Sequence, residues 1–160
     1  MRIVGIDPGT IATGYGFIEE NNGKIRLLET GTIEPKRKDP LAKRIERIYG
    51  NLDQLITEYR PDILILEKLY AHYKHPTTAN ILGHVRGVIC LLTAQRNVVL
   101  VEHSVKRIRK ALTGNGNATK IQTQHTVADL LKIDGSKLTL DASDALALAL
   151  GYLSIEGRIR

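Results

Sequence analysis

Several residue types are scarce in this chain of 160 residues, and each scarcity argues against a class of protein. The chain has one cysteine, one methionine, one phenylalanine and no tryptophan. A single cysteine cannot form a disulfide framework and favours a reducing compartment, and we expect Cys90 to be a small core residue of an apolar helix. No apolar run approaches the length of a membrane span, and no signal-peptide segment precedes the first strand-like residues. We therefore expect a soluble cytoplasmic protein with no membrane partner.

Charge of one sign is in excess. Lysine and arginine total 23 against 17 acidic residues, which gives a formal net charge of +6. A basic protein favours a polyanionic partner such as nucleic acid, although charge alone leaves the alternative that it binds none. The length suits one domain that buries roughly 70% of its unfolded surface. No repeat, low-complexity tract or linker divides the chain.

Apolar patterns predict an α/β domain with a mixed five-stranded sheet flanked by helices. The expected strands are 2–7, 14–19, 24–33, 63–66 and 97–101. The expected helices are 40–59, 77–95, 104–112, 118–131 and a last one containing 145–150. That last segment alternates with period two, as a strand does. Because alanine and leucine are strong helix formers and the preceding Asp and Ser residues suit a helix N-terminus, we predict a helix there.

Four carboxylates lie at the ends of apolar segments that are far apart in the chain: Asp7, Glu67, Asp141 and Asp144. An ionised carboxylate beside a buried element is costly unless a cation or a hydrogen-bond donor compensates it. Asp7 and Glu67 each end a predicted strand, and open α/β sheets place their sites at the carboxyl ends of strands. The spacing i, i+3 places the other two acids on one helix face. The four acids are therefore our candidate active site.

Each acid also has a purely structural interpretation. Asp7 could shape the Asp-Pro-Gly turn, Asp141 could be an N-cap, and Asp144 could be a solvated acid that favours the helix dipole. Glu67 has the weakest alternative, because it directly continues the run Ile-Leu-Ile-Leu and needs a counter-charge if it stays in the sheet. If the acids converge, two Mg²⁺ ions about 4 Å apart can serve an attack on a phosphodiester, and oxygen ligands suffice for them.

Separated stretches of the chain closely resemble RuvC, the family of bacterial Holliday-junction resolvases. In order, they are Gly-Ile-Asp-Pro-Gly-Thr at 5–10, Thr-Gly-Tyr-Gly at 13–16, Leu-Glu at 66–67, Gly-His-Val-Arg-Gly at 83–87, Thr-Gly-Asn-Gly-Asn-Ala-Thr-Lys at 113–120, and Asp-Ala-Ser-Asp-Ala-Leu-Ala at 141–147. The resemblance covers about residues 2–153. We therefore expect one nuclease domain over 1–153 and a C-terminal tail, 154–160, to which we assign no function.

The resemblance implies a ribonuclease H-like fold and a structure-specific endonuclease of DNA recombination and repair. Such an enzyme cuts a four-way DNA junction by symmetric paired nicks and leaves 5′-phosphate and 3′-hydroxyl ends. It also implies a homodimer, the partners RuvA and RuvB, and up to two Mg²⁺ per subunit, with Mn²⁺ able to substitute. The catalytic and metal-binding acids of the family carry over onto Asp7, Glu67, Asp141 and Asp144. The helix at 77–95 resembles the one that pairs across the RuvC dimer; a core-only helix is the alternative.

The expected DNA contacts are Tyr70, Arg86, Lys106, Arg109, Lys110 and Lys120. Tyr70 matches an aromatic residue that stacks on a base near the crossover in RuvC-like proteins. Lys106, Arg109 and Lys110 share a helix face that could bind phosphates or simply be solvated. Lys120 matches a family lysine, whereas Arg109 stands where a lysine is usual, which matters because the two cations differ in shape and hydration.

Three rival functions remain open at this stage. The Gly-Ile-Asp-Pro-Gly-Thr stretch also resembles the first phosphate motif of actin-like and sugar-kinase ATPases, but those proteins close two such domains over a nucleotide. A related single-domain nuclease could act on another substrate such as an RNA–DNA hybrid. A junction-binding protein without cleavage is the third possibility, and the presence of all four acids argues against it.

Overall fold

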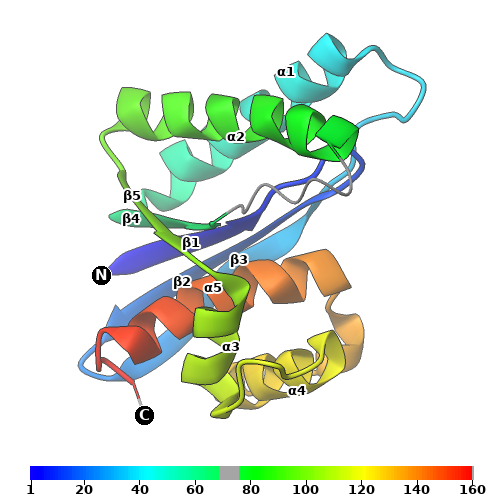
Figure 1. Ribbon diagram of the computed structural model, residues 1–160. Helices are drawn as coiled ribbons and strands as arrows, with labels where there is room; N and C mark the ends of the chain where they lie inside the picture. Colours follow the sequence, from blue (N-terminus) through cyan, green and yellow to red (C-terminus); the bar gives the residue numbers. More distant parts are fainter. Residues whose placement is uncertain (69–75, 160) are drawn as a thin grey trace.

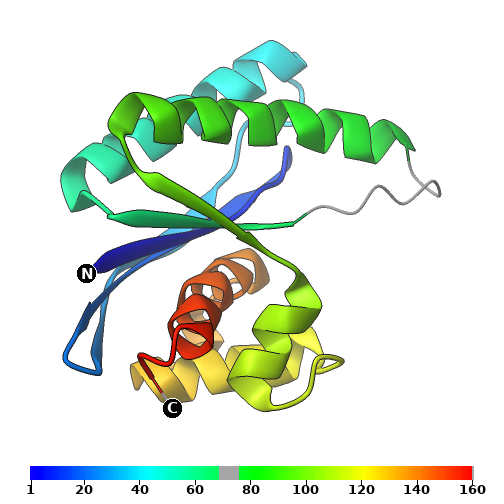
Figure 2. The ribbon, with the colours of Figure 1, turned by 60° about the vertical axis from the view of Figure 1, so that its left-hand side comes forward.

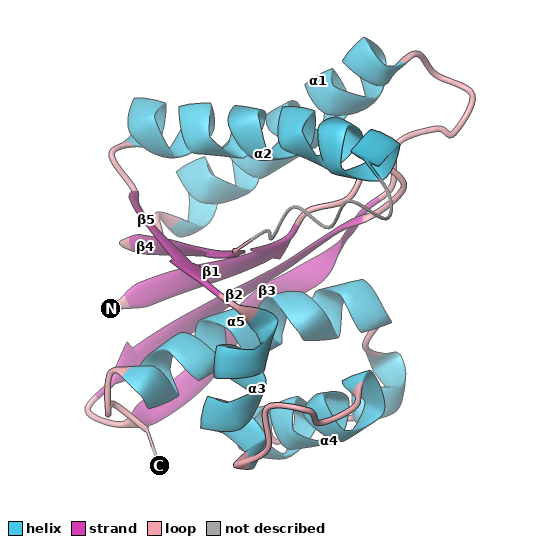
Figure 3. Ribbon diagram, viewed as in Figure 1, coloured by secondary structure: helices cyan, strands magenta, loops and turns pink. Residues whose placement is uncertain are grey.

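The computed structural model describes residues 1–68 and 76–159, and within them five strands form one mixed sheet in the order β3-β2-β1-β4-β5 (Figure 1). The strands are β1 (Arg2–Asp7), β2 (Thr13–Asn21), β3 (Lys24–Ile33), β4 (Ile63–Glu67) and β5 (Val99–His103). The helices are α1 (Leu41–Tyr59), α2 (Pro76–Arg96), α3 (Val105–Thr113), α4 (Lys120–Leu131), the short 3-10 helix η1 (Gly135–Lys137) and α5 (Leu140–Ile155). The predicted mixed five-stranded sheet flanked by helices is confirmed (Figure 3).

The molecule has three layers. Helices α1 and α2 cover one face of the sheet, and α5 with α3 and α4 covers the other (Figures 1 and 2). Each interface has its own apolar core, centred on Phe17, Leu64 and Ile89 on the first face and on Ile18, Ile65 and Leu146 on the second. Alternate residues of one strand serve the two cores, as Leu64 and Ile65 do, because successive side chains point to opposite faces of a sheet.

The strand directions determine which residues meet at one edge. β1 pairs antiparallel with β2 and parallel with β4, and β4 pairs parallel with β5. β2 and β3 form an antiparallel hairpin, whose turn places Asn22 and Gly23 at positive φ. The carboxyl ends of β1, β4 and β5 therefore lie along the same edge of the sheet, where open α/β folds place their sites.

Several element boundaries differ by one or two residues from the sequence prediction, and local hydrogen bonds explain where α2 ends and where α5 begins. Helix α2 extends to Arg96, after which Asn97 takes a left-handed φ of 53° and Val98 N–H donates to the Thr93 carbonyl; β5 therefore begins at Val99 rather than at residue 97. Helix α5 begins at Leu140, because the Thr139 hydroxyl accepts a hydrogen bond from the Ala142 amide and caps the helix. Asp141 is therefore not the N-cap.

The prediction for Cys90 is wrong, because its side chain is exposed. Helix α2 buries Val85, Ile89 and Leu92, which recur at intervals of four and three and face α1 and the sheet. Cys90 follows Ile89 and so lies about 100° round the helix, outside that buried stripe. Apolar side chains of this segment therefore also occur on the side of α2 that its own subunit does not cover.

The C-terminal residues continue the last helix and then fold back. Helix α5 runs to Ile155, past the domain boundary expected at residue 153. Arg158 N–H donates to the Leu153 carbonyl, and its guanidinium forms an ion pair with Glu20 at 3.3 Å. Among the described residues, no helix combines the length and apolarity needed to cross a membrane.

Candidate active site

Two of the predicted acids end neighbouring strands of the sheet. Asp7 is the last residue of β1 and Glu67 is the last residue of β4. The two strands are parallel and in register, with Ile6 opposite Leu66. The strand pairing by itself therefore brings the two carboxylates to one edge, as the apolar runs before them predict.

Helix α5 carries the other two acids to this edge because three glycines let it lie directly on the sheet. A Cβ atom built at Gly14 would be 2.0 Å from the carbonyl oxygen of Asp141, and one at Gly5 would be 1.9 Å from that of Ala145. At Gly16 a Cβ would overlap the side chain of Leu146. No larger residue fits at these contacts, so the absence of side chains on β1 and β2 determines how close the helix comes.

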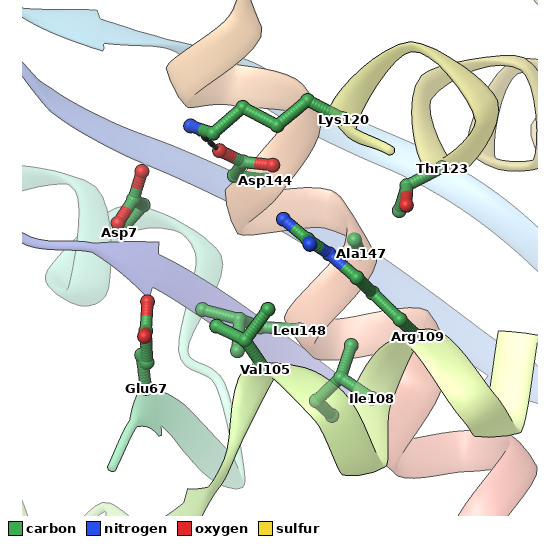
Figure 4. A pocket seen from close by; sticks show the side chains of 10 residues that line it. All are labelled: Asp7, Glu67, Val105, Ile108, Arg109, Lys120, Thr123, Asp144, Ala147 and Leu148. Carbon is green, nitrogen blue, oxygen red and sulfur yellow. Dashed lines mark hydrogen bonds and ion pairs between the residues drawn. The ribbon is translucent and has the colours of Figure 1, made fainter. Parts of the chain in front are cut away.

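Three of the acids line one cavity of about 310 Å³ (Figure 4). Glu67 points toward Asp7 from below, and Asp144 lies across the cavity on α5 (Figure 4). The remaining polar lining consists of Arg109, Lys120 and Thr123, and the apolar lining consists of Val105, Ile108, Ala147 and Leu148. The Lys120 ammonium forms an ion pair with the Asp144 carboxylate. The cavity thus combines three carboxylates, two cations and an apolar wall.

The fourth acid lies beside this cavity. Asp141 lines a neighbouring hollow between the loop after β1 and the first turns of α2, together with Gly9, Thr10, Ile11, Ala12, Thr78, Ile81 and Leu82. Its charge still contributes to raising the pKa of Asp7. The i, i+3 spacing therefore places Asp141 and Asp144 at the same end of α5 but in adjacent depressions.

The purely structural interpretations of these acids are weaker in the folded chain. The turn after Asp7 is closed by Thr13, whose hydroxyl donates to the Gly9 carbonyl at 2.6 Å and accepts from the Gly9 amide at 3.3 Å. The helix dipole acts most strongly in the first turn of α5, and Asp144 lies beyond that turn. Its ion-pair partner is Lys120. The turn therefore does not need Asp7, and the helix dipole does not explain Asp144.

The acids raise each other's pKa. Burial raises the pKa of Asp7 to about 7, and the charges of Asp144, Glu67 and Asp141 add to this while Lys120 opposes it. Burial and the charge of Asp144 also raise the pKa of Glu67, against the opposing charges of Lys120, Arg109 and Arg86. For Lys120, burial favours the neutral amine, but the hydrogen bond and charge of Asp144 with the charges of Asp7 and Asp141 outweigh it and raise its pKa. The site holds more negative charge than its cations neutralise.

A divalent cation fits the chemistry of this donor set. Carboxylate oxygens are the hard ligands that Mg²⁺ prefers, and a cation would relieve the charge that raises the pKa of Asp7. Among residues 1–68 and 76–159, no three carboxylate, histidine or cysteine groups lie close enough together to bind one metal ion. The fit therefore lies in the donor chemistry and the excess charge of the site.

The predicted DNA-binding residues that the structure describes divide into three groups. Arg109 and Lys120 line the cavity, whereas Lys106 and Lys110 are exposed on the side of α3 where Gly116 packs. Arg86 lies on α2 with its side chain only 13% exposed, and it donates to the Glu67 carbonyl and to Glu102. Tyr70 lies outside the described residues. The structure thus places Arg86 apart from the other cations.

Sequence reasoning missed two residues that shape the loop between Asp7 and β2. Thr13 is fully buried and closes that loop through Gly9. Arg44 on α1 donates from Nε and Nη2 to the Thr10 carbonyl. Thr13 lay within a quoted motif without an assigned role. Arg44 gave no signal, since its partner is a backbone atom 34 residues away.

Comparison with known proteins then identifies the family. The sequence profile described as "Crossover junction endodeoxyribonuclease RuvC" matches residues 3–152. The chain belongs to the RuvC family. It is 38% identical over 148 residues to the protein of that name from Rhodopirellula baltica, covering 92% of this chain and 83% of the relative. It is 40% identical over 150 residues to the RuvC of Chloroherpeton thalassium, covering 94% and 80%.

Solved RuvC structures share the fold. Thermus thermophilus RuvC, in a structure described as a complex with Holliday junction substrate, superposes with a TM-score of 0.89 at 24% identity, covering 98% of this chain and 94% of that one. The yeast mitochondrial Holliday junction resolvase Ydc2 gives a TM-score of 0.71 at 15% identity, covering 98% and 79%. The ribonuclease H-like fold predicted from the RuvC resemblance is thereby confirmed.

Proposed function

We propose that this chain resolves four-way DNA junctions as a crossover junction endodeoxyribonuclease. The observation that carries the proposal is the single cavity in which Asp7, Glu67 and Asp144 meet two cations, in a chain of the RuvC family. Its relatives of 38% and 40% identity bear the name of this activity. The net positive charge suits the polyanionic substrate. The enzyme hydrolyses phosphodiester bonds and leaves 5′-phosphate and 3′-hydroxyl ends.

The acids are the metal ligands and catalytic residues in this proposal. RuvC proteins are metal-dependent nucleases. The residues that would hold the metal are Asp7, Glu67 and Asp144 in the cavity and Asp141 in the adjacent hollow, and their carboxylates would have to move closer together than the structure places them. The metal is Mg²⁺, up to two ions per subunit, with Mn²⁺ able to substitute. When bound, such ions supply an activated water and stabilise the leaving oxygen of the cleaved strand.

The cations orient the scissile strand. Arg109 and Lys120 lie across the cavity from Asp7 and Glu67, so a phosphate entering it meets hydrogen-bond donors on one side and these two acids on the other (Figure 4). Lys120 must exchange its contact with Asp144 for a phosphate oxygen, which frees that carboxylate for a cation. Lys106 and Lys110 bind phosphates further along the strand, and Tyr70 stacks on a base near the crossover. Such stacking contributes about 1 to 3 kcal/mol.

Two symmetric nicks require two sites, and the proposed dimer supplies them. Helix α2 has an exposed stripe of mostly small residues on the side away from its own core, formed by Gly83, Gly87, Cys90, Leu91 and Ala94. A Cβ built at Gly83 or Gly87 meets no atom of the described residues within 4 Å, so a second helix can approach the backbone there. We assign this stripe as the isologous contact between two copies of α2. Each subunit then contributes one active site.

The setting of the reaction follows from the same assignment. The enzyme acts in the bacterial cytoplasm, in homologous recombination and DNA repair, with the branch-migration proteins RuvA and RuvB as partners. Residues 1–153 form its nuclease domain, and the tail 154–160 has no assigned role. These points rest on the RuvC family membership.

The test compares a mobile four-way junction with a linear duplex of the same sequence, each with Mg²⁺. We expect paired nicks in strands of like polarity on the junction alone. Asp7→Asn should abolish cleavage and leave junction binding intact, while Asp129→Asn, an exposed acid on α4, should change neither. Binding without cleavage by the unaltered chain would contradict the enzyme assignment. Cleavage of an RNA–DNA hybrid in preference to the junction would favour the rival nuclease.

A further inference from the structure

Arg86 is the predicted DNA contact whose surroundings do not suit that role. Its side chain extends from α2 to the carboxyl ends of β4 and β5 and is only 13% exposed. Nη1 donates to the carbonyl oxygen of Glu67 at 2.5 Å, and Nη2 forms an ion pair with the Glu102 carboxylate. An arginine that bound DNA from this position would have to leave both acceptors.

Both partners of Arg86 lie where the sheet ends. Glu102 on β5 is opposite Leu66 in the parallel pairing, and Glu67 is opposite His103. One further hydrogen bond continues the ladder, from the Lys68 amide to the His103 carbonyl at 2.8 Å. Arg86 therefore joins α2 to β4 and β5 at the residue whose carboxylate lines the cavity.

The guanidinium suits this position better than any other cation. It is planar and presents several N–H donors in a rigid fork, so it can bind a carbonyl and a carboxylate simultaneously. Removing it leaves the Glu67 carbonyl and a partly exposed carboxylate without their donor, and unsatisfied buried groups destabilise the local structure. Because Glu67 is the last residue of β4, strand pairing restrains it on one side only.

We propose that Arg86 is a positioning residue that holds the backbone of Glu67 so that its carboxylate stays directed into the cavity. The idea rests on the proposed nuclease function. Arg86 also lies next to Gly87 of the exposed stripe on α2, so the helix that we assign to the dimer contact is the one that restrains Glu67. Displacements of about 1 Å in a catalytic group can lower a rate about 100-fold, so a small loosening has a measurable effect.

The experiment compares Arg86→Met and Arg86→Lys with Arg96→Met. Arg96 is a matched control, because it is also on α2 and pairs with a carboxylate, Asp53, at 2.6 Å. We expect Arg86→Met to lower the single-turnover cleavage rate at saturating Mg²⁺ and protein about 10- to 100-fold, with unchanged junction affinity. Arg86→Lys should recover part of the rate, since an ammonium can reach one of the two acceptors. Arg96→Met should cleave like the unaltered chain.

Salt dependence separates positioning from DNA contact. A phosphate contact contributes about 0.9 to the slope of log affinity against log salt concentration on duplex DNA. A positioning residue leaves that slope unchanged. A slope reduced by about one, together with an unchanged rate at saturation, would overturn the proposal and return Arg86 to the DNA contacts. An unchanged rate with an unchanged slope would overturn it as well.

A readout that needs no activity distinguishes this proposal from the nuclease assignment. Hydrogen exchange of the Lys68 amide, bonded to His103, reports the ordering of the strand end. We expect at least 10-fold faster exchange there in Arg86→Met and unchanged exchange in Arg96→Met, whether or not the chain cleaves junctions. If Arg86→Met does not fold, Glu102→Gln removes only the ionic partner and should give a smaller acceleration at the same amide. Protection equal to that of the unaltered chain in the folded variants would refute the positioning role.

Discussion

Helices α5 and α2 cover opposite faces of one sheet, and they differ in how much of their circumference the subunit buries. Helix α5 has ten buried residues, including every residue from Ala145 to Gly151. Helix α2 buries one stripe and exposes another. Helix α5, which its own chain surrounds, carries two of the acids. Those acids must be positioned to within a fraction of a helical turn. The half-covered helix leaves exposed the surface that we assign to a second copy. In our proposal, the helix buried on all sides carries catalytic residues and the helix buried on one side serves assembly.

The largest effect is expected from a substitution at Gly14, which disturbs the packing of α5 on the sheet. A valine there would place its Cβ 2.0 Å from the Asp141 carbonyl oxygen, so α5 must move away from β2. We expect a loss of about 3 kcal/mol in the free energy of unfolding and no detectable cleavage. Urea unfolding and a junction assay measure the two effects. Gly50→Ala on α1 is the control, because a Cβ there meets no described atom within 4 Å and alanine favours a helix. Equal destabilisation by both changes would contradict the close approach of α5.

The excess negative charge of the candidate active site predicts that one substitution, Asp7→Asn, stabilises the folded chain rather than destabilising it. The folded pKa of Asp7 is raised from 3.8 to about 7, so the folded state binds a proton more tightly than the unfolded state. Stability of the metal-free chain should therefore fall as pH rises from about 4 to about 7 and then level off. Asp7→Asn lacks this penalty. In EDTA at pH 8 it should be more stable by about 2 kcal/mol, after a discount for water penetration and screening, and at pH 4 the two chains should be equal.

Adding Mg²⁺ should reverse this difference. A ligand that binds only the folded state raises the unfolding free energy of the unaltered chain, and the variant lacks one of its ligands. Thermal unfolding at pH 8 with and without Mg²⁺ measures both effects. A variant no more stable than the unaltered chain in EDTA would show that the acids are better compensated than their surroundings indicate.

The α2 side of the comparison predicts a change in assembly without a change in fold. Gly87→Glu places a charged side chain in the exposed stripe, where its Cβ meets no described atom of the same subunit within 4 Å. In an isologous pair two such charges face each other, so we expect at least a 100-fold weaker dimer with an unchanged circular dichroism spectrum. Analytical ultracentrifugation measures the dissociation constant. A dimer of unchanged affinity would move the contact to another surface.

The smallest effect is expected at Cys90. Because its side chain is exposed rather than packed in the core, Cys90→Ser should change the unfolding free energy by less than about 0.5 kcal/mol. A buried cysteine would give a larger loss, since serine brings a hydroxyl that needs a partner. Urea unfolding below the dimer dissociation constant provides the measurement.

Much of the sheet and the candidate site could be predicted from local sequence. Asp7 and Glu67 follow apolar runs that form adjacent parallel strands, and strand geometry then forces their ends together. The helix predicted over 40–59 was correct for the same kind of reason, and it buries Ile48, Leu52 and Ile56 at intervals of four residues. These features depend on periodicities within about ten residues, so the local pattern contains them.

The errors concern which face of an element is covered. Cys90 belongs to an apolar segment, and its exposure depends on α2 having a neighbour on one side only. Arg86 resembles other cations of the chain in sequence, and its partners, Glu67 and Glu102, are brought to it by a β-α-β connection. No pattern around either residue contains the position of these neighbours.

The sequence by itself therefore determined the strand and helix order and the resemblance to the RuvC family, and it singled out the four acids that we propose as the active site. Tertiary structure alone decided that Asp141 and Asp144 lie in adjacent depressions, that Lys120 pairs with Asp144 and that Arg86 donates to the Glu67 carbonyl. The physical reason is distance along the chain. Local patterns specify each element, but the close packing of α5 against the glycines of β1 and β2 determines which side chains meet.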